Sequence, residues 1–475
     1  MREFAIVGGG IGGCSVAALL HARGHDVVLI EKEPSLGGCA STFTRKGHRY
    51  NAGATTIAGY HRGGVLRRLC DTIGVELDVI PTDPAVTIVQ EGKRCVRYRD
   101  LEKFLDEIHR FYPHPRHAEF WTLVRTIGTA FEEMEGYGYS NASLFSKLRS
   151  LAGFFPVLKT FWPYLHANAR RFIQDFYGGA DREYLDFLDA QILIVAQATS
   201  DRVNFFTAAL ALGYTFNEIH YPLGGMGAVC ERIASRLPDV RRGCEVRSIE
   251  KTDAGYRLVT SGGTISARNL IMGTSHYESS GLFRDPEILS YYHRYETLDN
   301  HQSAFVLYLR FRSERIYDHH YQLISPKILP HTLSQSVFVS LSDPADTAMA
   351  PRGEYCLTAS IHTDAREWIG ADPSRYKAQK EELQALLQSM ICDTLSLSGD
   401  AVIESFSATP KTFRRYLNRT QVGGNAMTCA NILPRLPSND TPIKGFYQVG
   451  DTAYAAQGWP GVVIGAINCA RLIDG

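Results

Sequence analysis

Short apolar runs separated by glycine turns fill the first ~75 residues of the chain. Phe4 to Val7 is a four-residue apolar run of the kind that forms a buried parallel strand. Apolar positions then recur at helical spacing from Ile11 until Gly24, and a second apolar run ends at Ile30. This order predicts a parallel strand-helix-strand unit at the start of the chain.

The pattern changes further along the chain. Alternating apolar and polar residues at 86–98 predict a hairpin with Glu91-Gly92 at its turn. Helical spacing dominates from residue 100 to about 211, in a stretch dense in aromatic residues. Next come a helix at 228–237 and strands at 245–250, 257–260 and 270–273. Strand-like segments, a charged helix at 373–395 and a terminal helix at 461–472 complete the prediction.

The first turn carries glycines where a bound phosphate requires them. Gly8 permits the turn, Gly10 the close approach of a pyrophosphate, and Gly13 the tight packing of helix on strand. The free N–H groups at the helix start, Ile11 and Gly12, are expected to face the phosphates. Just after the second strand, Glu31 is placed to accept hydrogen bonds from a ribose, and Lys32 follows it. These positions predict a dinucleotide site.

Two further elements favour FAD over NAD as the cofactor. The glycine pair Gly37-Gly38 would let backbone N–H groups reach the second face of the pyrophosphate or the ribityl chain, the alternative being an ordinary surface turn. Near the C-terminus, a strand ends in Gly450-Asp451, which supplies a second acid. The helix start that follows would stabilise a reduced isoalloxazine ring through its positive end, and NAD needs no such element. Its candidate cofactor residues are Gly458, Trp459, Pro460 and Val462.

These predictions give an α/β fold class with a discontinuous, Rossmann-type FAD-binding domain made of residues 1–75, 221–276 and 401–475. An α+β substrate-binding domain would comprise residues 76–220 and 277–400. Residues 100–211 form its largely helical, aromatic-rich lobe, which we expect to house a large apolar ligand.

The sequence resembles the phytoene desaturase and carotenoid isomerase family of FAD-dependent oxidoreductases, and within it the cyanobacterial-type enzymes. The matching segments follow the family's order along nearly the whole chain: 37–43, 53–59, 221–226, 408–410 and 450–461. The resemblance implies a long polyene or polyprenyl substrate, desaturated or isomerised by hydride transfer to or from flavin N5. It also implies that Val246 approaches the adenine and that Thr55 and Thr56 lie near the flavin ring.

Two other functions remain open at this point. One is an amine-oxidase-like flavoenzyme with a polar substrate, and the other is a non-catalytic prenyl-binding escort, as in the GDP-dissociation-inhibitor relatives. No residue stands out as a catalytic base. Tyr60, His61 and Arg62 are weak candidates, because their glycine-flanked segment is also typical of a solvated loop. The substrate, the electron acceptor and the oligomeric state are left undetermined.

Composition excludes several classes of protein. Fifty basic and fifty acidic side chains cancel over 475 residues, which argues against nucleic-acid binding through overall charge. Ten cysteines without a CxxC pair indicate reduced thiols in a cytoplasmic protein, with no metal site. Cys39 is therefore interpreted as small-residue packing. His319-His320 is interpreted as a surface loop, because neighbours on a strand would point to opposite faces. The start of the chain shows no basic leader, so we expect no secretory signal.

One segment predicts contact with a membrane. No acidic residue occurs between Glu135 and Asp175, whereas five cations are interspersed with aromatic residues there, namely Lys147, Arg149, Lys159, Arg170 and Arg171. Basic heads on anionic lipid with aromatic rings at headgroup depth are typical of a monotopic surface, here on the inner face of the cell membrane. The alternative is a helical wall of the substrate domain with snorkelling cations. No apolar stretch approaches the ~20 residues that span a bilayer.

Overall fold

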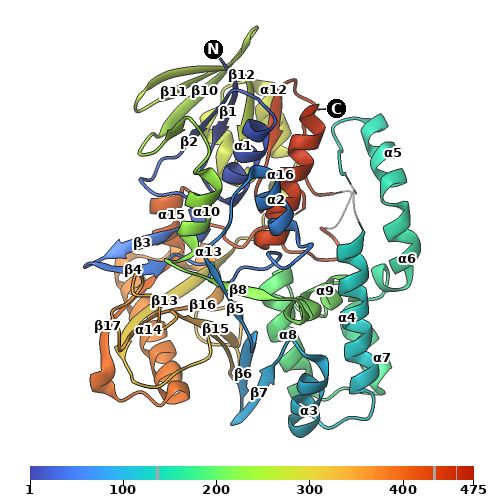
Figure 1. Cartoon of the computed structure of the whole chain (residues 1–475), viewed down its shortest axis with the longest axis vertical. Coiled ribbons are helices and arrows are strands. Elements are labelled where there is room, and N and C mark those ends of the chain that lie inside the picture. The colour runs from blue at the N-terminus through green and yellow to red at the C-terminus, as the bar shows by residue number, and fades with distance from the viewer. Residues whose placement is uncertain (135–137, 432–434, 456, 475) are drawn as a thin grey trace.

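The computed structural model describes residues 1–134, 138–431, 435–455 and 457–474 and arranges them around two large sheets with a helical lobe at one side (Figure 1). Both termini lie beside the first sheet (Figure 1). The α/β class predicted from the sequence is confirmed. None of the described helices combines the length and the apolar character needed to cross a bilayer.

The first sheet takes its strands from three distant parts of the chain. Their order is β10-β11-β12-β1-β2-β9, with β18 also paired to β12, and the pairs around β1 are parallel. The strands are β1 (Arg2–Val7), β2 (Val27–Ile30), β9 (Val240–Arg241), β10 (Val246–Thr252), β11 (Gly255–Thr260), β12 (Gly263–Met272) and β18 (Phe446–Gln448). Four helices pack on one face: α1 (Ile11–Ala22), α2 (Val65–Ile73), α10 (Met226–Ala234) and α16 (Gly458–Asp474). Helix α12 (Pro286–His293) covers the other face.

The second sheet has the order β17-β13-β16-β15-β14-β6-β7 and is mostly antiparallel. Its strands are β6 (Val86–Gln90), β7 (Lys93–Arg97), β13 (Gln302–Arg312), β14 (His320–Ile324), β15 (Ser336–Leu341), β16 (Glu354–Asp364) and β17 (Val402–Ala408). Helix α14 (Pro373–Leu395) has the predicted bounds and buries Leu383, Leu387 and Ile391, spaced by one turn, against this sheet.

Strand β17 corrects a predicted boundary. It pairs with β13 in the second sheet, so the third stretch of the dinucleotide domain begins after it and not at residue 401. The sequence could not reveal this, because a short strand carries no mark of the sheet that it joins. The other short elements are the pairs β3 (Thr42–Arg45) with β4 (His48–Asn51) and β5 (Val79–Thr82) with β8 (Ile219–Pro222), and helices α11 (His276–Ser279), α13 (Ala365–Ile369) and α15 (Pro410–Leu417).

The helical lobe predicted for residues 100–211 is present. It consists of α3 (Leu101–Phe111), α4 (His117–Glu133), α5 (Leu144–Gly153), α6 (Phe155–Leu165), α7 (Ala169–Tyr177), α8 (Arg182–Ala196) and α9 (Phe205–Gly213). Phe104, Trp121 and Phe205 are fully buried in its core, and Trp121 meets Phe104 edge to face at 4.8 Å between ring centroids. The core of the lobe is therefore built largely from packed aromatic side chains.

The start of α1 is held by two close approaches. A Cβ atom built on Gly13 would lie 1.9 Å from the carbonyl oxygen of Gly8, and one on Gly12 would lie 2.9 Å from the backbone nitrogen of Gly450. Neither distance is tolerated by a side chain, so these glycines let the helix start meet both the first turn and the end of β18. The first and last parts of the chain join here.

Replacing Gly13 by Ala should lower the free energy of unfolding by about 1–3 kcal/mol or more, since the added carbon overlaps a backbone carbonyl that cannot rotate away. Denaturant unfolding of the cofactor-free protein would measure it. Gly153→Ala is the matched control, because a Cβ there meets no atom within 4 Å and should leave stability unchanged or raised by up to ~1 kcal/mol. Equal stability of Gly13→Ala and wild type would contradict the packing.

Candidate functional site

A cavity of about 1480 Å³ runs from the first turn of the dinucleotide domain to the helical lobe. All predicted cofactor residues except Gly13 line it, and Gly13 packs on the first turn behind it. The lining set is Gly8, Gly10, Ile11, Gly12, Glu31, Lys32, Gly37, Gly38, Thr55, Thr56, Val246, Gly450, Asp451, Gly458, Trp459, Pro460 and Val462. The structure thus brings them to one cavity, and their contact with a cofactor stays a prediction.

The glycine turns leave a space that fits a phosphate. A Cβ on Gly10 would meet no atom of the protein within 4 Å, and Gly10 lines the cavity. Gly37 pairs with Gly10 across a backbone bridge and donates its N–H to the carbonyl of Gly9 at 2.7 Å. Gly10 is also the N-cap of α1 and makes no side-chain capping bond, so the positive helix end faces this space. Such a cradle suits the diphosphate of a dinucleotide.

Glu31 is fixed at the end of β2. One carboxylate oxygen accepts the N–H of Gly9 at 2.6 Å and the other accepts the N–H of Glu33 at 2.8 Å. Desolvation raises the pKa of Glu31 above its ordinary value, against the lowering effect of these two N–H groups. The hydroxyl groups of a ribose could donate further hydrogen bonds to this partly buried carboxylate.

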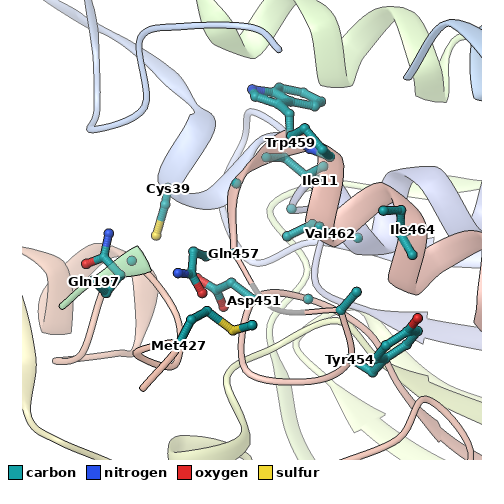
Figure 2. A pocket seen from close by; sticks show the side chains of 18 of the residues that line it. Ile11, Cys39, Gln197, Met427, Asp451, Tyr454, Gln457, Trp459, Val462 and Ile464 are labelled. Carbon is teal, nitrogen blue, oxygen red and sulfur yellow. The ribbon is translucent and has the colours of Figure 1, made fainter. Parts of the chain in front are cut away.

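The C-terminal segment forms the opposite wall. Figure 2 shows Asp451 and Gln457 pointing into the same space as Cys39, with Ile11 and Val462 nearby. Asp451 accepts a hydrogen bond from Nη1 of Arg419 at 3.2 Å. Burial lowers the pKa of Arg419, but the neighbouring carboxylate of Asp451 raises it, and the net result lies above the ordinary value. Arg419 lies in a loop without a recognisable motif, so sequence reasoning missed it.

A buried polar network holds the two threonines expected near the flavin. Ser340 Oγ lies 2.7 Å from Thr55 Oγ1 and 2.9 Å from His320 Nδ1, while His320 Nε2 lies 3.2 Å from Thr56 Oγ1. Burial lowers the pKa of His320 to about 3, so its ring is neutral near pH 7. The predicted surface loop at His319-His320 is therefore wrong. His320 begins β14 and is buried, because strand pairing with β15 turns its ring inward.

The candidate bases at 60–62 do not line the cavity. Tyr60 is buried and its hydroxyl accepts the N–H of Leu77 at 3.0 Å, so it is not part of a solvated loop. His61 lies 3.3 Å from Glu132, and Arg62 is exposed. Within residues 59–64, the cavity lining is formed by Gly59, Gly63 and Gly64, so the structure gives no support to these three candidate bases.

The far half of the cavity is apolar. Its walls come mainly from the helical lobe, with Phe338 from the second sheet and Met427 from the connection between α15 and β18. The lobe contributes Phe131, Met134, Phe154, Val157, Leu158, Leu165, Phe206 and Leu210. Glu132 is the only carboxylate that the described part of the lobe places on this wall. Both of its oxygens are engaged, by Nδ2 of Asn217 at 2.8 Å and Nε2 of His61 at 3.3 Å.

A family model described as flavin containing amine oxidoreductase matches residues 11–472. The chain belongs to this flavin-containing amine oxidoreductase family. Its relatives include the chloroplastic prolycopene isomerase of Daucus carota, 25% identical over 99% of this chain and 80% of that protein. A neurosporene-forming phytoene desaturase of Rhodobacter capsulatus is 23% identical over 100% of this chain and 94% of its own length. Both names confirm the resemblance seen in the sequence.

Solved structures with the same fold align over the whole of this chain. An oxidoreductase of Methanosarcina mazei aligns over 100% of both chains with a TM-score of 0.64 and 17% identity. Putrescine oxidase bound to putrescine aligns over 100% of this chain and 99% of its own, with a TM-score of 0.64 and 15% identity. The cofactor is therefore FAD, and the protein is an FAD-dependent oxidoreductase, as predicted. The hypothesis of a non-catalytic escort is not supported.

Replacing Gly10 by Val should abolish or strongly reduce FAD retention, by tenfold or more in affinity, because the side chain fills the space that the diphosphate needs. The fold should persist, since a Cβ at Gly10 meets no protein atom within 4 Å. Flavin absorbance per purified chain would measure occupancy, and the unfolding temperature of the cofactor-free protein would be the control. Full occupancy in this variant would contradict the assignment.

Proposed function

We propose that the protein acts on a long apolar polyene or polyprenyl chain of the carotenoid type, by desaturation or by cis-trans isomerisation. The observation that carries this proposal is the apolar half of the cavity, which continues directly from the residues expected to hold the flavin. The cavity volume exceeds the roughly 300–1,000 Å³ typical of pockets for one small molecule. The relatives named prolycopene isomerase and phytoene desaturase support the same substrate class.

The chain's own residues would orient the substrate and keep water out. When bound, FAD supplies the hydride-transfer chemistry that a hydrocarbon without polar groups requires. Phe131, Phe154 and Phe206 give the cavity wall broad apolar faces against which a conjugated chain packs. The neutral His320 keeps Thr55 and Thr56 in fixed positions without adding charge to the site. This arrangement favours a substrate that is bound by apolar packing and shape complementarity and not by ion pairs.

An amine substrate is the second candidate, because putrescine oxidase shares the fold. A cationic amine in an apolar cavity is stabilised most strongly by a free carboxylate. Glu132 is already engaged by Asn217 and His61, and Asp451 is engaged by Arg419. Glu31 is held by two backbone N–H groups at the opposite end of the cavity. Glu278 also lines the cavity and keeps one buried oxygen without a partner among the described residues, but it lies near Arg419 and outside the apolar half. The described residues of the apolar half therefore favour an uncharged substrate.

We further propose that helices α5 and α6 dock on a membrane from which the substrate enters. Figure 1 shows both helices at the outer edge of the lobe. Six large apolar side chains on them are more than half exposed, namely Leu144, Phe145, Leu148, Leu151, Phe155 and Trp162. So many exposed large apolar side chains on two consecutive helices are unusual on the surface of a soluble monomer.

Charge and cavity shape both support lipid as the occupant of this surface. Lys147, Arg149 and Lys159 are exposed on the same two helices, which carry no acidic residue, so anionic headgroups would be attracted. Leu144, Leu148 and Leu151 also line the cavity, so the cavity reaches the patch. A polyene dissolved in the bilayer could enter there without crossing water. We accordingly propose a cytoplasmic protein bound peripherally to the inner face of the cell membrane.

Expression in a bacterial host that makes varied carotenoids should change its pigments. We expect one polyene to decrease while another, differing in the number or geometry of its double bonds, accumulates. Chromatography with diode-array detection would measure this, with the Gly10→Val variant as the flavin-deficient control. Unchanged pigments together with reduction of the bound flavin by simple amines would contradict the proposed substrate and favour the second candidate.

The purified protein should sediment with vesicles that contain anionic lipid at low salt, and less at high salt because ionic attraction is screened. A triple variant, Phe145→Ser, Phe155→Ser and Trp162→Ser, should bind at least tenfold more weakly, since three exposed apolar side chains are lost. Ile316→Ser is the control, because Ile316 is 87% exposed but lies in the second sheet's β13–β14 connection. Absence of sedimentation of the wild type with anionic vesicles would remove the docking proposal.

A further inference from the structure

Arg419 carries a guanidinium group that is only partly satisfied. Its side chain is 12% exposed, Nε donates to the carbonyl of Gln421 at 2.6 Å, and Nη1 donates to Asp451 at 3.2 Å. Nη2 is buried and has no hydrogen-bond partner among the residues that the structure describes. An unpaired buried donor on a charged group is costly, so a ligand acceptor at this point would be strongly stabilising.

The position of Arg419 identifies the ligand group. Nη1 lies 3.9 Å from Sγ of Cys39, the residue that directly follows the glycine pair Gly37-Gly38. Gly38 in turn faces Gly10, since a Cβ on Gly38 would lie 3.5 Å from the Cα of Gly10. Arg419, Gly38 and Gly10 all line the same cavity. The guanidinium is thus placed beside the glycine cradle and not beside the apolar half.

We infer that Arg419 is a cofactor-binding residue whose Nη2 donates to the diphosphate of FAD. Cys39 brings no charge to the turn after the glycine pair, and the cation arrives instead from the remote loop before β18, at residue 419. A planar guanidinium matches phosphate oxygens well, and here two of its nitrogens are already fixed by Gln421 and Asp451. The ligand therefore meets a donor that has lost its rotational freedom beforehand.

A competing explanation is that Arg419 only neutralises its acidic neighbours. Asp451 accepts a hydrogen bond from Arg419. Burial lowers the pKa of Arg419, whereas the nearby carboxylates of Asp451 and Glu278 both raise it. Removing the cation alone would leave both acids to repel a phosphate, so a single variant cannot separate the two explanations. Replacing Arg419 and Asp451 together by neutral residues preserves the net charge of the cluster.

The test uses ADP as the probe, because ADP contains the diphosphate but neither the flavin ring nor the ribityl chain. Binding to the cofactor-free protein would be measured by calorimetry for wild type, Arg419→Gln, Arg419→Gln/Asp451→Asn and the control Arg414→Gln, whose side chain is exposed on α15. We expect Arg419→Gln to weaken ADP binding about tenfold or more, with the double variant equally weak and the control unchanged. FAD affinity should fall in parallel.

Two results would overturn the inference: wild-type ADP affinity in Arg419→Gln, or recovery of that affinity in the double variant. Weaker binding of FAD with unchanged binding of ADP would likewise overturn it, by placing the contact on the flavin. Circular dichroism and the unfolding temperature check that the variants are folded. If Arg419→Gln does not fold, Arg419→Lys is tested in its place. Lysine has a shorter side chain and a non-planar donor, so this variant should weaken ADP binding severalfold if Nη2 of Arg419 makes the contact. This test does not depend on the identity of the substrate.

Discussion

The contact between the start of α1 and the end of β18 is the constraint on which the rest of the structure depends. Gly12 and Gly450 approach so closely that a side chain at residue 12 would collide with the backbone of Gly450. This contact joins the first dozen residues of the chain to its last thirty and sets the two walls of the cofactor cavity. The cradle at Gly10, the acid at Glu31 and the acid at Asp451 face one cavity because of it.

The cavity begins at this contact and has a polar end and an apolar end. At one end, the start of α1 and the guanidinium of Arg419 lie beside the glycine turns, where we propose that the diphosphate of FAD binds. At the other end, aromatic and aliphatic side chains replace polar groups, and the described carboxylate on the wall is already engaged. In the proposed arrangement, FAD occupies the first end and the middle of the cavity, and a long uncharged substrate occupies the second end.

Much of the fold was predictable because its signals are local. The strand-helix-strand unit, the hairpin at 86–98 and α14 follow from periodicity. The glycines predicted from their spacing to bind the cofactor line the cavity, with the exception of Gly13. What sequence reasoning missed depends on pairing between distant segments. His320 is buried only because β14 pairs with β15, and β17 joins the second sheet only because β13 offers a free edge. Arg419 acquires a role only where the loop folds beside Cys39 and Asp451.

The most direct measurement is a difference absorption spectrum of the purified, flavin-loaded protein titrated with a long polyene in mild detergent. A polyene bound against the flavin should perturb the flavin bands in a saturable way, because the ring then exchanges water for an apolar neighbour. That result is the one expected here. No perturbation at any polyene concentration, with bleaching of the flavin by a small amine instead, would contradict the assignment of the apolar half of the cavity as the substrate site.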